Sequence, residues 1–415
     1  MSQQIPSSST TGSGAGDKDG TDQPIEPQGT TTTSPETPSS MAASAAAAER
    51  KRPNALQEIF SLSRFVTGAV THPLENIRYV SSMMRQMGSK LIGRKGFDPE
   101  TDIGDLSGRV VLVTGGTSGL GKQTILQLSK HNPATIYLAA RSESKALSTI
   151  AEIKSSLPPT QSATLNLQHL PLDLSSFASI RAAATLFTSS SKRLHTLILN
   201  AGVMALDPDT TSDGYEIQFG TNFLGHFLLT KLLLPTLLET ANSSPHADVR
   251  VISISSWAWQ MAPLPCQSPL QTMTSTPALL ASNTWTRYGC SKAANAALAA
   301  QLARLYPEQI TAVSVHPGLI HTNLYGVTEE KNPVVRVGVA AVAPLLTGER
   351  EGALGHLWAV GVGREVLRGP DGRGNGGYFE PVGVRARNWF VEDEGVGRGL
   401  WEWAEGEVRG WVGDD

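Results

Sequence analysis

Tyr288 and Lys292, four positions apart, are the side chains of this 415-residue chain whose types and spacing best suit acid–base chemistry. On a helix, positions i and i+4 share a face, so the phenol and the ammonium would lie together. A phenol has a pKa of about 10, and a neighbouring ammonium favours its ionised form, which brings that pKa toward the working range. Alone, this spacing is also that of an ordinary helix pair, so it needs support from the rest of the chain.

A glycine-rich segment, Thr114-Gly115-Gly116-Thr117-Ser118-Gly119-Leu120-Gly121, directly follows a short apolar run and opens a helical stretch. Glycine permits a tight turn and lets backbone N–H groups approach a pyrophosphate. The positive end of the dipole of the helix that follows also attracts this anion. The glycine spacing is G-x-x-x-G-x-G, not the G-x-G-x-x-G of the better-known dehydrogenases. The segment predicts a dinucleotide site whose cofactor-binding residues are Gly115, Thr117, Ser118, Gly119, Leu120 and Gly121.

The residue after the second apolar run indicates which dinucleotide binds. In nucleotide-binding sheets, an acidic residue roughly 20 positions beyond the glycines binds the ribose 2′-hydroxyl of NAD. Here that place is held by Ala140-Arg141-Ser142. Arg141 could pair with the 2′-phosphate of NADP through charge-assisted hydrogen bonds, although it could also be a solvent-facing arginine at a helix start. We therefore expect NADP (NADPH) as the cofactor.

Short apolar runs alternate with helical stretches from Gly108 onward. This alternation indicates parallel strands joined by right-handed crossovers, with the ligand site at the carboxyl ends of the strands. The predicted fold is α/β, a Rossmann-type doubly wound parallel sheet in a single domain with an N-terminal extension. We expect strands at 110–114, 135–140, 165–172, 194–200, 249–255 and 310–315, and helices near 121–130, 142–156, 175–190, 213–239 and 288–305.

Three segments are predicted along the chain. Residues 1–53 are a disordered low-complexity tail, because their Ser, Thr, Gly, Pro and Ala content offers too little apolar surface to fold. Residues 54–104 are a helical extension with two amphipathic helices interrupted at Pro73, which we expect to dock on the main domain rather than on a partner or a membrane surface. Residues 105–415 form the NAD(P)-binding Rossmann catalytic domain, closed by a helix that carries Trp401 and Trp403.

Composition excludes several classes of protein. The net charge of -3 argues against a nucleic-acid binder, and 2 cysteines exclude a disulfide scaffold and a four-cysteine zinc site. His226, His316 and His321 lack metal-like spacing, so no metal site is predicted. No apolar run reaches the length of about 18 residues that a membrane span needs. We expect a cytoplasmic protein, with peripheral contact to an intracellular membrane as the alternative.

Taken together, the motifs resemble the short-chain dehydrogenase/reductase family over about residues 106–385. Thr114 to Gly121 is similar to the family's Thr-Gly-x-x-x-Gly-x-Gly, and Tyr288 with Lys292 to its Tyr-x-x-x-Lys. Within the family, residues 377–383 and 400–403 are most similar to the retinol-dehydrogenase-like branch and its fungal relatives.

The resemblance implies further site residues. Asp173 and Leu174 would contact adenine, and Asn200, Ala201 and Gly202 would close the fourth strand beside the cofactor. Asn222 stands at the position of the family's active-site asparagine. Of Ser255 and Ser256, the family pattern makes the second the catalytic serine, a choice that spacing alone leaves open. Pro317, Gly318 and Thr322 would hold the nicotinamide carboxamide.

The implied reaction is hydride transfer from NADPH to a carbonyl carbon. Tyr288 would protonate the developing alkoxide, and Ser256 would hydrogen-bond the carbonyl oxygen. Lys292 would lower the tyrosine pKa and bind the nicotinamide ribose. Asn222 would hold a water that links the lysine to solvent.

An insert between Ser256 and Tyr288 favours a lipophilic carbonyl or alcohol as substrate. It contains Trp257, Trp259, Met261, Met273 and Trp285, while Leu324, Tyr325, Val327, Val334 and Val335 supply a second apolar side. Those tryptophans could instead pack the insert onto the domain. Two other functions remain open from sequence: a non-catalytic dinucleotide-sensing protein, and a reductase of an activated carbon–carbon double bond.

Overall fold

The computed structural model describes residues 96–263, 267–318, 320, 347–369, 372 and 374–413. The chain divides into two units, Met1–Arg52 and Pro53–Asp415, and every described residue belongs to the second. The predicted tail, both amphipathic helices, Thr322 and the apolar positions 324–335 lie outside the described residues. The domain boundaries after 53 and 104 therefore stay predictions. The first described helix is α4 (Pro99–Asp102).

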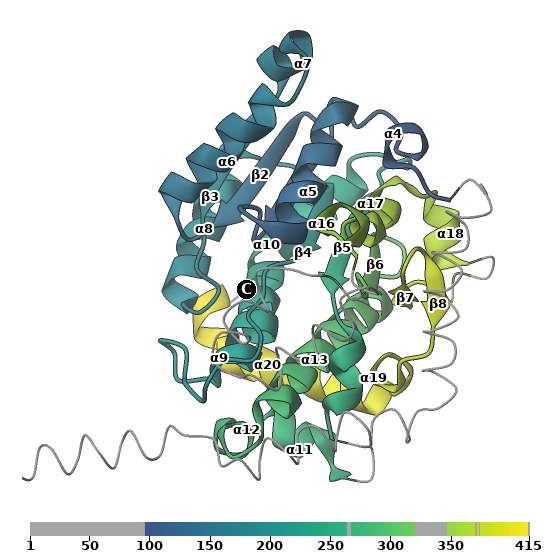
Figure 1. Cartoon of the computed structure of the whole chain (residues 1–415). Coiled ribbons are helices and arrows are strands. Elements are labelled where there is room, and N and C mark those ends of the chain that lie inside the picture. Colours follow the sequence, from purple (N-terminus) through teal and green to yellow (C-terminus); the bar gives the residue numbers. More distant parts are fainter. Residues whose placement is uncertain are drawn as a thin grey trace, which may run out of the picture. The chain divides into compact units, whose positions relative to one another are not determined.

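The described strands form one sheet of eight, in the order β3-β2-β1-β4-β5-β6-β7-β8 (Figure 1). The six predicted strands are confirmed within two residues at each end, and β7 and β8 were not predicted. Their bounds are β1 (Val110–Thr114), β2 (Thr135–Ala140), β3 (Leu167–Pro171), β4 (Thr196–Leu199), β5 (Val249–Ile254), β6 (Ile310–Val315), β7 (Tyr378–Glu380) and β8 (Val384–Ala386).

The neighbouring strands from β3 to β7 pair in parallel, as predicted, but β8 runs antiparallel to β7. The predicted doubly wound parallel sheet is therefore confirmed, with one antiparallel strand added at this edge. Only three residues, 381–383, separate β7 from β8, and Gly383 has a φ of +72°. So short a turn can join only antiparallel strands, because a parallel pair needs a long crossover.

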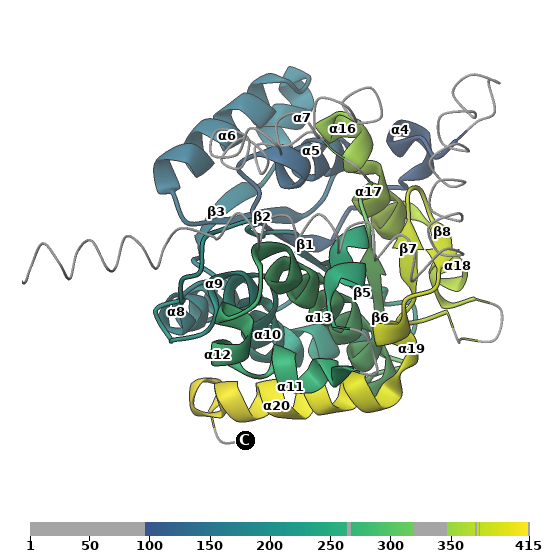
Figure 2. The same ribbon diagram turned by 60° about the horizontal axis from the view of Figure 1, so that its bottom comes forward.

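Helices cover both faces of the sheet (Figure 2). One face carries α5 (Gly119–Leu128), α6 (Glu143–Ser155), α16 (Glu349–Gly352) and α17 (Leu354–Gly361). The other carries α8 (Phe177–Ser190), α10 (Gly225–Asn242) and α13 (Thr284–Leu305). Shorter helical segments are η1 (Ser129–His131), α7 (Pro159–Thr164), α9 (Ile217–Phe219), η2 (Gly220–Leu224), η3 (Trp257–Met261), α11 (Pro269–Met273), α12 (Thr276–Leu280), α18 (Arg364–Arg368) and α19 (Trp389–Glu392).

Two helix starts differ from the prediction for local reasons. Helix α13 begins at Thr284, four residues earlier than predicted, because the Asn283 side chain accepts a hydrogen bond from the Thr286 N–H and caps it. The helical region predicted from 213 begins only at Ile217, since Thr210 and Glu216 form an antiparallel bridge before it.

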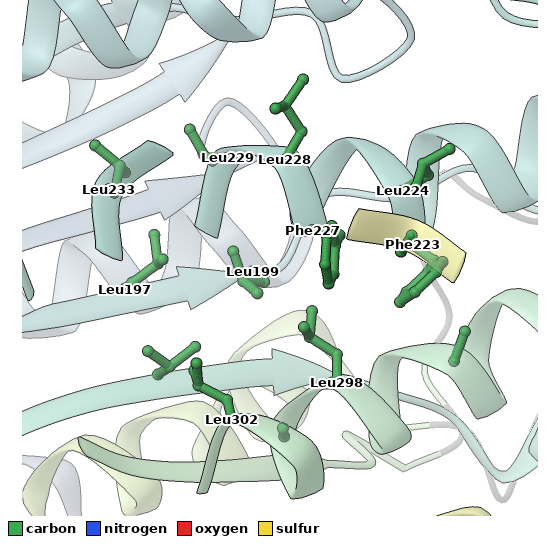
Figure 3. Packing of buried hydrophobic residues seen from close by; sticks show 14 of the residues in the cluster. Leu197, Leu199, Phe223, Leu224, Phe227, Leu228, Leu229, Leu233, Leu298 and Leu302 are labelled. Atoms are coloured by element: carbon green, nitrogen blue, oxygen red, sulfur yellow. The ribbon is translucent and has the colours of Figure 1, made fainter. Parts of the chain in front are cut away.

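Alternate residues of each strand enter opposite cores, as the period of two requires. In β1, Leu112 packs in the core on the α10 and α13 side, and Val111 and Val113 pack in the core on the α5 and α6 side. Figure 3 shows the first core, where Leu197 and Leu199 of β4 lie among side chains of α10 and α13. Both faces of the sheet are thus buried, which explains its continuous apolar runs.

A long C-terminal helix, α20 (Glu394–Val412), closes the first core, as predicted. It lies across α10 and α13 in Figures 1 and 2. The Trp401 ring meets Phe227 of α10 edge-on, with 4.9 Å between ring centroids. The Trp403 ring packs against Tyr215 and Phe219.

Candidate active site

The strand order reverses between β1 and β4, which are neighbours in the sheet but not in the chain. Such a switch point opens a crevice at the carboxyl ends of the strands. The Thr114 hydroxyl at the end of β1 accepts the backbone N–H groups of Asn200 and Ala201, each at 2.9 Å. The Asn200 side chain returns a hydrogen bond to the Thr114 carbonyl at 2.8 Å. These bonds fix the glycine-rich loop to the segment that follows β4.

The glycine-rich loop has the geometry of an anion cradle. Gly115 has a φ of +70°, and a Cβ there would lie 2.9 Å from the Ala201 Cα. A Cβ at Gly121 would overlap the Gly115 carbonyl oxygen, whereas one at Gly119 would meet nothing nearer than the Glu349 Oε1 atom, 3.8 Å away. The Ser118 side chain makes no capping hydrogen bond to α5. The first N–H groups of α5 therefore receive no hydrogen bond from a capping side chain, and the space next to Gly119 is open. This arrangement fits a pyrophosphate.

The other predicted cofactor residues follow neighbouring strands. Arg141 is exposed directly after β2. Asp173 follows β3, and its Oδ1 atom accepts the Ser175 N–H at 2.9 Å and the Ser175 hydroxyl at 2.6 Å, so this carboxylate shapes the turn. Gly318, after β6, has a φ of +99° that few other residues adopt. Arg141, Asp173 and Gly318 thus each follow the carboxyl end of a strand of the sheet.

Tyr288 and Lys292 share one face of α13, with the Lys292 Nζ 5.7 Å from the centre of the tyrosine ring. The ammonium donates to the Ile254 carbonyl at 3.0 Å and is buried, at 5% exposure. Burial lowers the pKa of Lys292 to about 8, because the low-dielectric interior disfavours the charged form. A Cβ at Gly202 would lie 3.5 Å from the Nζ atom, so the segment after β4 borders the lysine.

Asn222 lies in η2, a π-helical turn, and its side chain holds two segments in place. Its Oδ1 accepts the Val203 N–H at 2.7 Å, and its Nδ2 donates to the Val203 carbonyl at 2.9 Å. The Nδ2 also donates to the Ser291 hydroxyl at 2.9 Å, and that hydroxyl donates to the Tyr288 carbonyl at 2.8 Å. Asn222 therefore connects the segment after β4 with the turn of α13 that carries Tyr288.

The two adjacent serines have different environments. Ser255 is buried, and its hydroxyl donates to the Lys292 carbonyl at 2.7 Å. Ser256 is half-buried, and its hydroxyl accepts the Ala258 N–H at 3.1 Å at the start of η3. A Cβ at Gly289 would lie 2.7 Å from the Ala258 carbonyl oxygen. This close approach allows η3 to pack against α13 next to Tyr288.

Apolar side chains surround Tyr288. The buried residues of this cluster are Met204, Ala258, Met261 and Tyr288, and the partly buried Ala205, Trp257 and Trp285 pack against them. By contrast, Trp259 and Met273 of the insert belong to the main core. The insert thus contributes Trp257, Met261 and Trp285 to the surroundings of Tyr288, while its other two large side chains serve packing.

Sequence reasoning missed a buried ion pair beside Tyr288. The Arg287 Nε lies 3.0 Å from the Glu216 Oε1, at side-chain exposures of 2% and 0%. Arg287 also donates to the carbonyls of Leu206 and Ser282, each at 2.7 Å. It thereby ties the end of the insert to the loop after β4 that carries Met204. A charged residue in an alanine-rich helix was the one sequence signal for this pair.

The doubly wound sheet with a glycine-rich loop at its switch point defines a Rossmann-type dinucleotide-binding protein. Residues 109–268 match the family model of short chain dehydrogenases. A short-chain dehydrogenase/reductase of Armillaria gallica is 39% identical over 310 residues, which cover 73% of this chain and 91% of that protein. The retinol dehydrogenase 12 of Mus musculus is 39% identical over 218 residues, covering 52% of this chain and 62% of that protein.

A crystal structure of an uncharacterized protein from Mycobacterium paratuberculosis has the same fold, with a TM-score of 0.56 and 24% identity over 76% of this chain and 98% of that one. The chain belongs to the short-chain dehydrogenase/reductase family, and it is an oxidoreductase of a family that uses NAD(P). The predicted resemblance to the retinol-dehydrogenase-like branch is confirmed.

Within the described ranges, none of the helices combines the length and the apolar composition that a membrane span requires. No group of three or more His, Cys, Asp or Glu side chains there could hold a metal ion.

Proposed function

We propose that this protein is an NADP(H)-dependent oxidoreductase that interconverts a lipophilic carbonyl compound and its alcohol. When bound, the reduced nicotinamide supplies a hydride to the carbonyl carbon. The proposal rests on one juxtaposition above all: Tyr288 lies in an apolar cluster, while the Lys292 ammonium lies 5.7 Å from the centre of its ring.

Tyr288 gives its proton to the carbonyl oxygen as that oxygen becomes an alkoxide, and the Lys292 ammonium stabilises the resulting phenolate. Ser256 donates a hydrogen bond to the same oxygen. The choice of Ser256 is supported by counting protons, because the single hydroxyl proton of Ser255 goes to the Lys292 carbonyl. The Ser256 hydroxyl accepts a bond from Ala258 and keeps its proton for the substrate.

Asn222 completes the proton path in this proposal. Both amide protons of its side chain are used, and Oδ1 keeps one acceptor position beyond the bond from Val203. A Cβ at Gly202 would lie 3.2 Å from this Oδ1 and 3.5 Å from the Lys292 Nζ, so both atoms border the same small space. A water at Oδ1 links Lys292 to solvent and restores the proton after each turnover.

An apolar substrate fits the cluster around Tyr288, because an unpaired polar group buried there would cost free energy. The name of the related retinol dehydrogenase 12 agrees with a lipophilic substrate. In a homologous series of aldehydes, we expect KM to fall with each added methylene. Each methylene should add up to about 0.8 kcal/mol of binding free energy. Steady-state kinetics across the series tests this, with chains ending in a carboxylate as the control. A flat series, or activity confined to charged or polyhydroxy substrates, would rule out the apolar site.

Arg141 supports NADP(H) over NAD(H), since it is exposed at the end of β2 where an acidic residue would select NAD. Arg141→Asp should weaken NADPH binding by about 1.5–3 kcal/mol, the range of a hydrogen bond to a charged group. Fluorescence titration with both dinucleotides measures the effect. Arg181→Asp, the same charge change at an exposed position on α8, is the control and should leave both affinities unchanged. Tighter binding of NADH than of NADPH by the wild type would refute the assignment.

The buried ammonium of Lys292 should cost stability. Its folded pKa of about 8 lies below the unfolded value of 10.5, so unfolding takes up a proton between these pH values. The free energy of unfolding therefore rises with pH across this window. At pH 7, Lys292→Met should be more stable than the wild type by about 3 kcal/mol, and this advantage should vanish above about pH 10.5. Urea denaturation of both proteins without cofactor tests the sign, and an advantage that grows with pH would contradict it.

A further inference from the structure

A chain of buried hydrogen bonds joins the glycine-rich loop to the turn of α13 that carries Tyr288. Its members are Thr114, His226, Asn222 and Ser291, and each of these residues is fully buried, at 0% exposure. They come from three regions that are far apart in the sequence: β1, the contiguous helices η2 and α10, and α13. Because they are shielded from water, each polar atom must find its partner within the protein.

Counting protons fixes the direction of the first bond. The Thr114 hydroxyl accepts the N–H groups of Asn200 and Ala201, which fill both of its lone pairs. Its one proton must then be donated. The His226 Nε2 lies 2.9 Å away, whereas the Ile198 carbonyl is more distant at 3.4 Å. Thr114 therefore donates to His226, and the Nε2 atom must be unprotonated.

The same histidine must carry its proton on Nδ1. Burial lowers the pKa of His226 to about 3, so the ring is neutral near pH 7. Nδ1 lies 2.8 Å from the main-chain carbonyl oxygen of Asn222, which can only accept. One tautomer satisfies both contacts: Nε2 accepts from Thr114, and Nδ1–H donates to Asn222. Two further hydrogen bonds complete the path. The side-chain Nδ2 of Asn222 donates to the Ser291 hydroxyl, and that hydroxyl donates to the main-chain carbonyl of Tyr288.

We propose that His226 is a positioning residue, held as the Nδ1–H tautomer, that aligns the glycine-rich loop with the turn of α13 bearing Tyr288. The hydrogen bond between Thr114 and Nε2 holds the loop that binds the cofactor. The hydrogen bond from Nδ1 to Asn222 holds the segment that positions Tyr288. The kinetic consequence rests on the proposed function. The tautomer follows from the hydrogen bonds alone.

Two substitutions separate the two sides of the ring. In His226→Asn, the amide N–H lies near the former Nδ1 and keeps the bond to Asn222, but it does not reach Thr114. In His226→Gln, the amide oxygen reaches Thr114, and the bond to Asn222 is lost. We expect His226→Asn to weaken NADPH binding about 3- to 10-fold with kcat nearly unchanged, and His226→Gln to lower kcat about 3- to 10-fold with NADPH affinity nearly unchanged.

His356→Gln is the matched control. His356 is also fully buried, its pKa is likewise lowered to about 3 by burial, and its Nδ1 lies 3.0 Å from the Thr124 hydroxyl. This variant should lose thermal stability while NADPH affinity and kcat stay within about twofold, since it lies outside the proposed path. Equal losses of affinity and kcat in both His226 variants, or no loss in either, would overturn the positioning role.

The tautomer is measured independently of turnover and of the variants' folding. Nitrogen-15 NMR of the histidine-labelled wild type, without cofactor, distinguishes protonated from unprotonated ring nitrogens. We expect His226 to show Nδ1 protonated and Nε2 unprotonated throughout the neutral range. An Nε2–H tautomer or a doubly protonated ring would overturn the inference even if the enzyme is active. The predicted NMR result in a protein without carbonyl reductase activity would uphold the hydrogen-bond path and count against the proposed function alone.

Discussion

Tyr288→Phe is expected to lower kcat by about 100- to 10,000-fold, the contribution of a positioned general acid. The substitution removes only the hydroxyl, and Tyr288 lies within an apolar cluster that the phenylalanine ring continues to fill. NADPH affinity should therefore stay within about twofold. Steady-state turnover with a confirmed substrate gives kcat, and fluorescence titration gives the cofactor affinity.

Tyr215→Phe is the control for this prediction. The Tyr215 hydroxyl donates to the Glu407 Oε2 at 2.6 Å, and its ring packs near α20, apart from the cluster around Tyr288. Its loss should leave kcat within about twofold. If Tyr288→Phe turned over as fast as Tyr215→Phe, the acid–base role would be wrong.

Arg287→Met is expected to reduce the free energy of unfolding by about 3–5 kcal/mol, because it leaves the Glu216 carboxylate buried and unpaired. The pair is almost completely shielded, at side-chain exposures of 2% and 0%. The substitution also leaves the Leu206 and Ser282 carbonyls without their arginine donors. Urea denaturation at pH 7 measures the loss.

The exposed pair Arg387–Glu392, with 2.8 Å between Nη2 and Oε2, provides the matched comparison. Its side chains are 62% and 43% exposed, so Arg387→Met should cost less than about 1 kcal/mol. The double variant Glu216→Gln/Arg287→Met should recover part of the stability, since no buried charge remains. An Arg287→Met protein no less stable than Arg387→Met would show that the buried pair contributes little.

Most of the sheet could be predicted because buried parallel strands are continuous apolar runs. Strand β1 is an example, since all five of its residues are buried. Strands β7 and β8 were missed because each has only three residues, too few to establish a period. The bridge between Thr210 and Glu216 also leaves no periodic signal, so the helical region after it was placed too early.

Site residues could be predicted where their spacing is local. Tyr288 and Lys292 share a helix face because they are four residues apart, and the glycine-rich loop is a contiguous motif. The Glu216–Arg287 pair and the contact between Thr114 and His226 join residues that are far apart in the chain. Such pairs depend on how the helices pack across the sheet, which no single segment encodes. The low pKa of Lys292 likewise follows from burial that only the folded chain creates.

The most direct test of the proposed function follows the hydride itself. The protein is incubated with NADPH deuterated at both C4 positions of the nicotinamide and a lipophilic α,β-unsaturated aldehyde, and the deuterium in the product is located by NMR and mass spectrometry. We predict one deuterium on the former carbonyl carbon of an allylic alcohol, and at least about 100-fold slower formation of that product when Tyr288→Phe replaces the wild type. Deuterium on the β-carbon would indicate reduction of the double bond instead. NADPH that binds but is never oxidised by any member of the aldehyde series would contradict the proposed catalysis and favour a dinucleotide-sensing protein.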